Sequence, residues 1–301
     1  MLEILFLGTG ASIPSRDRGL PAMAIRSGGD IVLMDCGEGT QRQFMLSPFS
    51  FMKIKAICIT HLHGDHFLGL SGLLLTMGLS GRKESITIAG PEGIEEILFT
   101  IISTCGDVLP FDVTIMEVSG DESFEVNNLD ISVFKTDHTV PSVGFSLSEK
   151  DTIRIDARKA AEKRVAPEDI SRIKKGIAVD GVVAKDIIAC TVKGLKVVYT
   201  GDTKPCDEIY NASMGADVLV HEATFGSTET KMAMDHGHTT SIQAAEIAKK
   251  CDVRMLILTH ISNRYKNRDP LLEEAMELFS NTKIAEDFMH ISVTHKAIKL
   301  I

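Results

Sequence analysis

The residues from Thr60 to His66 could bind a metal ion, because four side chains of ligand type fall within six positions. The segment reads Thr-His-Leu-His-Gly-Asp-His and offers His61, His63, Asp65 and His66 as candidate ligands. Imidazole and carboxylate together suit zinc, manganese or iron better than a metal that prefers thiolates. A single histidine is usually structural, but three histidines and an aspartate at this spacing are hard to explain by packing. The segment therefore predicts a metal site.

Three later segments share one pattern, an apolar strand-like run followed by a residue that can bind metal. These residues are His138, Asp202 and His260. With the first cluster they make seven candidate ligands, which are too many for one tetrahedral ion and suit two ions bridged by a carboxylate. Two ions about 3.5–4 Å apart can hold the attacking and leaving oxygens of a displacement. The seven residues therefore predict hydrolysis of a phosphoryl or acyl bond.

The elements that position these residues follow from hydrophobic periodicity. Residues 54–59 alternate and are rich in β-branched side chains, which predicts a strand before the metal loop, and residues 67–79 predict a helix after it. Further strands are expected at 2–7, 22–26, 31–35, 85–89, 195–200, 217–220, 254–259, 284–286 and 291–294, several short ones within 112–148, and helices at 39–47, 92–104, 240–250 and 270–280. Strands precede helices in each half of the chain. This order predicts an α/β fold of two mixed β-sheets packed face to face, with helices outside.

Residues 150–194 differ from the rest in composition, because they are charged and rich in Lys and Ala. We expect an insertion that projects from the core. Residues 154–196 hold eleven Lys or Arg and six Asp or Glu, a net charge of +5 in a chain whose net charge is −9. A basic segment on an acidic protein can bind a phosphate backbone locally, although a solvated surface would explain the charge equally well.

Composition excludes several other classes of protein. The longest apolar segment, residues 67–81, is interrupted by Gly and Ser and is shorter than the ~20 residues that a membrane span needs. The start of the chain lacks the basic region of a signal peptide. The six cysteines are scattered without a CxxC pair, which favours a reduced protein over a disulfide framework. We therefore expect a cytoplasmic protein without a membrane partner.

The metal loop resembles the HxHxDH signature of the metallo-β-lactamase superfamily, and the three later ligands are similar to its later motifs in order. More narrowly, the chain resembles the short form of tRNase Z (RNase Z). Residues 221–224 (HEAT) are similar to that family's HEAT loop, and residues 233–238 (AMDHGH) to its AxDHxH motif. Residues 238–240, 259–265 and 285–289 also fit. The resemblance covers essentially the whole chain.

The resemblance implies a metallo-β-lactamase-type αββα sandwich that forms a single domain over residues 1–301. Residues 150–194 would be the family's flexible arm, an exosite that grips tRNA. Lys174 and Lys175 would contact the tRNA backbone there, as phosphate positioning requires. The family's Gly-Pro motif in the arm is Ala166-Pro167 in this chain, so the conformation of the arm is expected to differ.

By the same resemblance, each subunit would hold two zinc ions, with manganese or iron as alternatives. The ligands of one would be His61, His63, His138 and Asp202, and those of the other would be Asp65, His66, Asp202 and His260, with Asp202 as the bridge. The enzyme would cut precursor tRNA, not DNA, after the discriminator nucleotide, leaving a 3′-hydroxyl on the tRNA. Family members are usually homodimers in which the arm of one subunit serves the site of the other.

Three residues receive catalytic roles from this resemblance. Asp65 would orient the nucleophile. His238 is the candidate general acid for the departing 3′-oxygen, because a histidine with a pKa near neutrality can donate a proton there. Glu222 could orient or tune His238.

Arg16 and Arg18 are candidate RNA contacts in the N-terminal loop. The family's PxKxRN motif reads Pro-Ser-Arg-Asp-Arg-Gly over residues 14–19, with Arg for Lys and Gly for Asn. In relatives this loop senses a mature CCA end, so discrimination against CCA is expected to be altered here.

Alternative functions remain open at this point. A small-molecule thioester hydrolase or phosphodiesterase of the same fold would share the seven ligands but would need neither a basic arm nor His238. A catalytically silent RNA-binding protein would have no reason to keep all seven ligands. The remaining polar residues have simpler explanations. His290 and His295 are expected to be structural, and His221 and His236 could be hydrogen-bond partners of the site. Asp35 and Cys36 could cap the next helix, and residues 264–268 could contact RNA or form a solvated turn.

Overall fold

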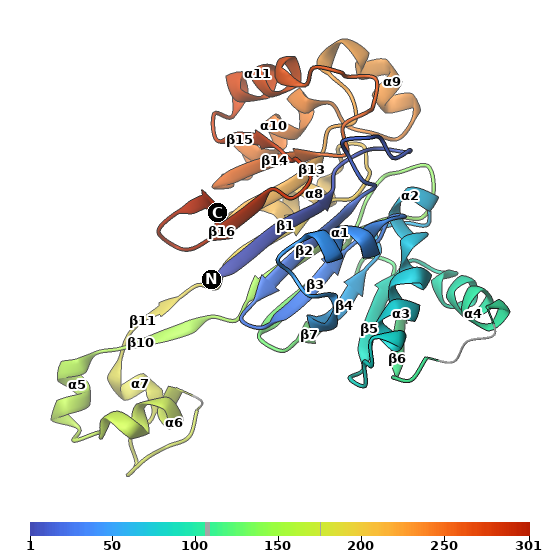
Figure 1. Cartoon of the computed structure of the whole chain (residues 1–301). Coiled ribbons are helices and arrows are strands. Elements are labelled where there is room, and N and C mark those ends of the chain that lie inside the picture. The colour runs from blue at the N-terminus through green and yellow to red at the C-terminus, as the bar shows by residue number, and fades with distance from the viewer. Residues whose placement is uncertain (106–108, 175) are drawn as a thin grey trace. The chain divides into compact units, whose positions relative to one another are not determined.

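Two units make up the described part of the chain, which covers residues 1–105, 109–174 and 176–301 in a computed structural model (Figure 1). The larger unit joins Met1–Ser148 to Leu195–Ile301, and the smaller unit is Glu149–Gly194. Its bounds fall within one residue of the insertion expected at 150–194. No helix among these residues is long and apolar enough to cross a membrane, and all six cysteines are free.

The first sheet of the larger unit has eight strands among the described residues, in the order β17-β16-β1-β2-β3-β4-β5-β6. The strands are β1 (Leu2–Gly8), β2 (Ala22–Ser27), β3 (Asp30–Met34), β4 (Ile54–Cys58), β5 (Ile86–Gly90), β6 (Val113–Glu117), β16 (His290–Val293) and β17 (Ile298–Leu300). Strands β3 to β6 are parallel, and the remaining pairs are antiparallel. The sheet is therefore mixed, as the sequence predicts.

The second sheet has seven strands among the described residues, in the order β15-β14-β13-β12-β9-β8-β7. The strands are β7 (Ser123–Val126), β8 (Leu129–Lys135), β9 (Val143–Glu149), β12 (Lys196–Tyr199), β13 (Val218–Glu222), β14 (Met255–Thr259) and β15 (Thr282–Ile284). Strands β12 to β15 are parallel, whereas β9 is antiparallel to β12. Parallel strands end at the same edge of a sheet, which brings the residues after β12 and β14 together.

Alternation of apolar side chains places the two sheets face to face, because successive residues of a strand point to opposite sides. In β1, Leu2, Ile4 and Phe6 belong to a core shared with strands of the second sheet, whereas Leu5 and Leu7 face a separate core. Strand β14 behaves likewise, with Met255 and Ile257 in the shared core and Leu256 and Leu258 on the outer side. Both sheets are therefore buried on two faces.

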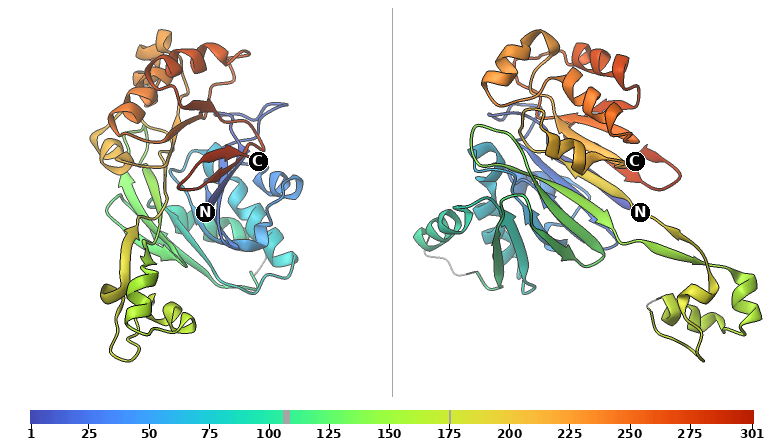
Figure 2. Two further views of the ribbon diagram at one scale, coloured as in Figure 1. Left: turned by 90° about the vertical axis from the view of Figure 1, so that its left-hand side faces the viewer. Right: turned by 180° about the vertical axis from the view of Figure 1, so that it is seen from behind.

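Helices cover the outer faces of the two sheets. On the first sheet these are α1 (Thr40–Leu46), α3 (Gly69–Leu79) and α4 (Ile94–Thr104), and on the second they are α8 (Asp207–Ser213), α10 (Ser241–Lys250) and α11 (Asp269–Leu278). The short elements η1 (Phe51–Lys53), α2 (Gly64–Phe67), η3 (Ser227–Glu229) and α9 (Thr230–Asp235) lie in connections. Figure 2 shows the orange and red helices of the second half grouped beside their sheet. The expected αββα arrangement is confirmed.

The smaller unit is a two-stranded ribbon with short helices. It contains β10 (Thr152–Ile155), α5 (Ala157–Glu162), η2 (Pro167–Asp169), α6 (Ile170–Lys174), α7 (Ala184–Ile187) and β11 (Ile188–Val192), and β10 pairs antiparallel with β11. Its own apolar core consists of Ala160, Ile173, Val182 and Ile187. The conformation is therefore held by a local core in addition to the ribbon.

Most expected elements are present, and strand β17 and the separate elements of the smaller unit are additions to them. The strand expected at 284–286 lies at Thr282–Ile284, because it pairs in register with β14. Helices α8 and α9 were not predicted. A short helix, α2, begins inside the metal loop, so that Asp65 and His66 lie on a helical turn instead of in a loop.

Candidate metal centre

The metal loop begins where β4 ends. His61 and His66 are fully buried, whereas His63 and Asp65 are partly exposed. Because α2 begins at Gly64, its first turn directs Asp65 and His66 to different sides. One short segment therefore supplies ligands at several angles.

The later ligands come from the second sheet. His138 follows β8, and Asp202 and His260 follow the parallel strands β12 and β14. Gly201 precedes Asp202 with a φ of +60°, and a Cβ there would lie 2.6 Å from the Cβ of Thr60. Only glycine therefore allows the chain to turn this close to the metal loop.

The first group of ligands consists of His61, His63, His138 and Asp202, whose ligand atoms lie within 4.8 Å of one another. His61 Nε2 lies 3.1 Å from His63 Nδ1 and 3.8 Å from Asp202 Oδ2. His138 Nε2 lies 3.2 Å from His63 Nδ1. The structure thus brings together the four residues expected at one ion.

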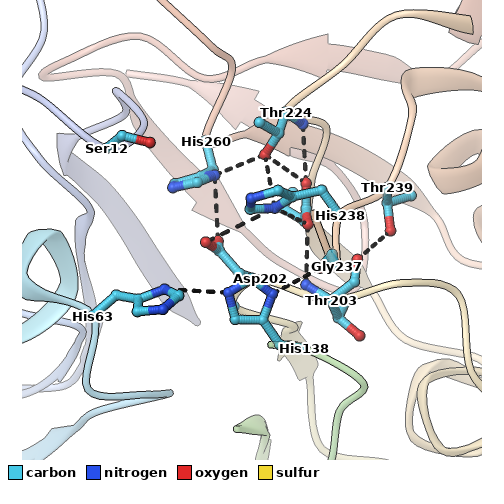
Figure 3. Close-up of polar contacts among 12 residues, drawn as sticks. Ser12, His63, His138, Asp202, Thr203, Thr224, Gly237, His238, Thr239 and His260 are labelled. Atoms are coloured by element: carbon cyan, nitrogen blue, oxygen red, sulfur yellow. Dashed lines mark hydrogen bonds and ion pairs between the residues drawn. The ribbon is translucent and has the colours of Figure 1, made fainter. Parts of the chain in front are cut away.

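The second group consists of Asp65, His66 and His260, again within 4.8 Å. Asp202 approaches two of them, with Oδ2 3.5 Å from His66 Nε2 and Oδ1 3.3 Å from His260 Nδ1. Asp202 therefore lies between the two groups, where a bridging carboxylate would lie. Figure 3 shows it between His260 on one side and His63 and His138 on the other.

Hydrogen bonds leave one ring nitrogen of most of these histidines free for a metal. His66 Nδ1 donates to Asp35 Oδ2 at 2.7 Å, and His138 Nδ1 donates to the carbonyl of Gly237 at 2.7 Å. Bonds of this kind fix the tautomer of a metal-binding histidine. The buried atoms His66 Nε2 and Asp202 Oδ1 have no hydrogen-bond partner within the described ranges. Nitrogen and oxygen donors converging in this way fit divalent cations.

The charges of the centre also fit a cation. Burial lowers the pKa of His61 well below its usual range, and the neighbouring His66 lowers it further, so the imidazole is neutral. Burial favours the protonated form of Asp202, but His260 and His66 outweigh it and hold the pKa well below the usual range. A neutral His61 beside an ionised Asp202 is the protonation state that a metal requires. Burial lowers the pKa of His66, but Asp202 and Asp35 outweigh it and raise that pKa well above its usual range, so His66 would give up a proton when a cation binds.

Asp35 holds the metal loop through hydrogen bonds, and the sequence alone did not identify it as a functional residue. Its fully buried carboxylate accepts hydrogen bonds from the Thr60 backbone and hydroxyl, from His66 Nδ1 and from the Tyr199 hydroxyl at 2.9 Å. The helix cap proposed for Asp35 is wrong, because helix α1 has Gly39 at its N-cap and no side-chain cap bond. The Asp35 side chain instead points towards the metal loop, which follows β4.

A second carboxylate, Glu222, binds His238 and Thr224, which Figure 3 shows beside His260. Glu222 Oε1 lies 2.8 Å from His238 Nδ1, and Oε2 accepts a 2.7 Å bond from the Thr224 hydroxyl. Thr224 Oγ1 in turn lies 2.8 Å from His260 Nδ1. The candidate acid and one metal ligand are therefore held by the same carboxylate.

Glu222 also sets the protonation of His238. Burial favours the neutral imidazole, but the Glu222 carboxylate outweighs it through its charge and its hydrogen bond, and raises the pKa of His238 to about 9. The side chain is 13 % exposed. His238 is therefore a protonated histidine with access to solvent, which can donate a proton.

The candidate RNA contacts lie in different settings. Arg16 is exposed in the N-terminal loop, whereas Arg18 is buried and its guanidinium donates to the Ile261 carbonyl at 2.6 Å and to Asn263 Oδ1. Lys174 is exposed at the end of α6 in the smaller unit. Lys175 lies outside the described residues. Contact with RNA stays a prediction for all four.

Other residues singled out in the sequence lie as follows. His221 is buried and its Nδ1 donates to the carbonyl of Glu222, whereas His236 and His295 are exposed. His290 Nε2 lies 3.0 Å from Glu3, in keeping with a structural role. Arg264 lies over the ring of Phe225, 4.8 Å from its centroid.

Comparison with known proteins agrees with this geometry. Residues 2–180 match the family model of Anti-Pycsar protein Apyc1, and residues 172–261 match the model of the beta-lactamase superfamily domain. The chain is 39 % identical to ribonuclease Z of Methanosarcina mazei over 98 % of its own length and 99 % of the relative's. It is 38 % identical to ribonuclease Z of Methanothermobacter thermautotrophicus, covering 97 % of each chain.

A solved structure has the same fold. The crystal structure of human tRNase Z, short form, superposes with a TM-score of 0.74 at 31 % identity, over 97 % of this chain and 99 % of that one. The two sheets and their outer helices are thus those of the metallo-β-lactamase fold.

Proposed function

The chain belongs to the ribonuclease Z family, and from that membership we propose that it is a hydrolase of phosphodiester bonds, an endoribonuclease that removes 3′ trailers from precursor tRNA. Cleavage would follow the discriminator nucleotide and leave a 3′-hydroxyl on the tRNA. The observation that carries the proposal is the combination of two ligand groups, with Asp202 in the first and within 3.5 Å of His66 and His260 of the second, and the ion pair of Glu222 and His238. A small-molecule hydrolase of this fold needs the ligands but not the ion pair.

Two zinc ions per subunit are the cofactors we propose, with manganese or iron as alternatives. His61, His63, His138 and Asp202 would hold one, and Asp65, His66, Asp202 and His260 the other, as the two ligand groups support. Bound divalent cations would lower the pKa of water and neutralise charge on the phosphate.

The residues of the chain supply orientation and a proton. Asp65 Oδ2 is held by the backbone N–H of Ser12 at 2.8 Å, so the carboxylate has a fixed direction in which to accept a proton from the nucleophile. His238, kept protonated by Glu222, would donate its proton to the departing 3′-oxygen. Glu222 itself is buried and would act by positioning His238 and, through Thr224, His260.

Arg16, Lys174 and Lys175 are the residues we propose for RNA contact, whereas Arg18, whose guanidinium donates to Ile261 and Asn263, would act by holding the N-terminal loop in place. The smaller unit, with its excess of Lys and Arg, would bind the phosphate backbone of the tRNA. We further propose a homodimer in the cytoplasm, as the resemblance to the short form of tRNase Z implies. Deletion of residues 154–193 should then weaken turnover of precursor tRNA, and it should leave hydrolysis of a small phosphodiester unchanged.

The proposal is tested by cleavage of a precursor tRNA with mapped product ends. We compare the wild type with His63→Ala, which removes a ligand, with His238→Ala, which removes the acid, and with His295→Ala at an exposed position as the matched control. A cut after the discriminator base should be lost with the first variant, strongly slowed with the second and unchanged with the third. A second precursor that ends in CCA shows whether the altered loop at 14–19 permits cleavage.

No cleavage by a metal-loaded wild type would refute the proposal. Turnover of small phosphodiesters or thioesters by the same preparation would then support the small-molecule hydrolase.

A further inference from the structure

The segment from Gly226 to Thr240, which we call the acid loop, carries the candidate acid His238 and returns to its own starting point. Ser241 N donates to the carbonyl of Phe225 at 3.0 Å, and Phe225 also forms a parallel bridge with Thr240. The ends of the loop therefore lie side by side, as in the compact surface loops of other proteins. His238 lies close to the point of closure, so its position depends on what holds the two ends together.

Backbone hydrogen bonds connect helix α9, in the middle of the acid loop, to the acid. His238 N donates to the carbonyl of Ala233 at 2.8 Å, and Gly237 N donates to that of Met234 at 3.3 Å. Gly237 has a φ of +74°, which lets the chain turn out of α9 directly into His238. A displacement of α9 would therefore displace the acid as well.

The carboxylate of Glu274, on helix α11, binds both ends of the acid loop. Glu274 Oε1 accepts hydrogen bonds from the Ser227 N–H at 3.0 Å and from the Ser241 hydroxyl, and Oε2 accepts one from the Ser227 hydroxyl at 2.6 Å. Hydrogen bonds to an ionised acceptor are stronger than those between neutral groups. One side chain thus joins the start and the end of the loop to a helix that packs on the second sheet.

Other contacts of the acid loop act at single points. The Tyr265 hydroxyl accepts a hydrogen bond from Gly226 N and donates to Glu229 Oε2, each at 2.9 Å, and both partners lie near the start of the loop. Glu222 binds the ring of His238, whereas the backbone that carries this ring belongs to the loop. Closure of the loop by a side chain is therefore assigned to Glu274.

We propose that Glu274 is a positioning residue for proton donation, because its carboxylate closes the acid loop and so keeps His238 within reach of the departing 3′-oxygen. The inference deepens the proposed function and rests on it for the role of His238. Glu274 itself touches neither the substrate nor a metal ligand in this arrangement. Its removal should therefore impair the step that needs a proton and leave metal binding intact.

The test compares two leaving groups in the zinc-loaded enzyme. The departing 3′-oxygen of precursor tRNA needs a proton, whereas bis(4-nitrophenyl) phosphate loses a stabilised phenolate that does not. Glu274→Ala should lower kcat on precursor tRNA by about 10- to 100-fold with little change in KM, since a displacement of about 1 Å in a catalytic group can cost up to about 100-fold. Hydrolysis of bis(4-nitrophenyl) phosphate should keep its wild-type rate.

Three further variants separate positioning from general damage to the fold. Glu273→Ala, at an exposed position on the same helix, is the matched control and should behave as the wild type on both substrates. Glu274→Gln should retain most of the wild-type kcat, because its amide oxygen can accept both Oε1 bonds and its NH₂ group can donate to the Ser227 hydroxyl. Addition of Glu274→Ala to His238→Ala should cause no further loss, because the clamp acts through the acid.

Hydrogen exchange of the backbone amides gives a readout that needs no RNA. Glu274→Ala should speed exchange within residues 226–241, because an unclamped loop opens more often. Exchange in the metal loop over residues 60–66 should stay at the wild-type rate, and Glu273→Ala should leave both segments unchanged.

Three results would overturn the inference while leaving the nuclease assignment intact. These are unchanged exchange of the acid loop in Glu274→Ala, equal losses of activity on the two substrates, and a further loss when Glu274→Ala is added to His238→Ala. Conversely, faster exchange of the acid loop in Glu274→Ala, in a protein whose wild type does not cut precursor tRNA, would support closure by Glu274 and refute the proposed function.

Discussion

Replacement of Asp35 by asparagine tests whether the carboxylate beneath the metal loop sets the metal-binding tautomer of His66. The two carboxylate oxygens accept bonds from Thr60, His66 and Tyr199. In Asp35→Asn one of these oxygens becomes an NH₂ group. If the amide oxygen stays with Thr60, the NH₂ group faces the N–H of His66 and the hydroxyl of Tyr199, so two donors lose their acceptor.

The expected magnitudes follow from burial, since Asp35 is fully buried. Hydrogen bonds to a charged group contribute about 1.5–3 kcal/mol each, so the loss of two should lower the free energy of unfolding of the metal-free protein by roughly 3–5 kcal/mol. A ring that flips to protonate Nε2 can no longer offer that nitrogen to a cation. Loss of such a supporting carboxylate typically costs about 10- to 100-fold in metal affinity.

Zinc affinity, measured by competition with a chromogenic chelator, and Tm with and without zinc are the assays. Tyr199→Phe removes one donor and leaves the charge, so it should lower the free energy of unfolding by about 1.5–3 kcal/mol and change zinc affinity little. Asp121→Asn, at an exposed position, is the matched control. Wild-type zinc affinity in Asp35→Asn, even with a lowered Tm, would refute the tautomer argument.

Three further outcomes are expected. In the metal-free protein Glu222 outweighs burial and raises the pKa of His238 to about 9. The resulting stabilisation of the folded state is complete below pH ~6.5 and is lost as pH rises to about 9. A plot of Tm against pH should show this fall in the wild type and not in His238→Gln. Gly201→Ala, which would place a Cβ 2.6 Å from Thr60 Cβ at a φ of +60°, should lower zinc affinity at least about tenfold in the chelator assay, and wild-type affinity would contradict the close approach. The Arg82 side chain is buried and donates to four backbone carbonyls, so Arg82→Met should lower the free energy of unfolding in urea titration by about 3 kcal/mol with unchanged zinc affinity.

The sequence places the candidate ligands in one cluster because the signal is local. Each of the later candidate ligands follows an apolar strand, and parallel strands end at one edge, so linear spacing is enough to gather Asp202 and His260. The supporting residues lack such a signal. Asp35 and Tyr199 belong to different sheets, and their contact depends on how the sheets pack. Thr224 is recognisable by resemblance only, and its bond to His260 requires the register of β13 against β14.

The missed helices have a similar cause. Helix α9 is six residues long and its sequence, TKMAMD, buries only Ala233, so it shows no apolar periodicity. Helix α8 buries Ile209 and Ser213, a pattern too short to distinguish from a loop. Strand β15 shifted because pairing with β14, and not its own composition, sets its ends.

The pairing of β1 with β16 has a consequence for the synthesis of the chain. Leu2 pairs with Val293 and Leu5 pairs with His290. Strand β1 is made first, but it can pair on both edges only after β16, near the end of the chain, has been made. The metal centre also cannot form before that stage, because it includes both His260 and residues made some two hundred positions earlier. Contacts this distant in sequence form slowly. A nascent chain is therefore unable to cut RNA beside the ribosome, where tRNA is abundant, and activity begins only once nearly the whole chain has been made.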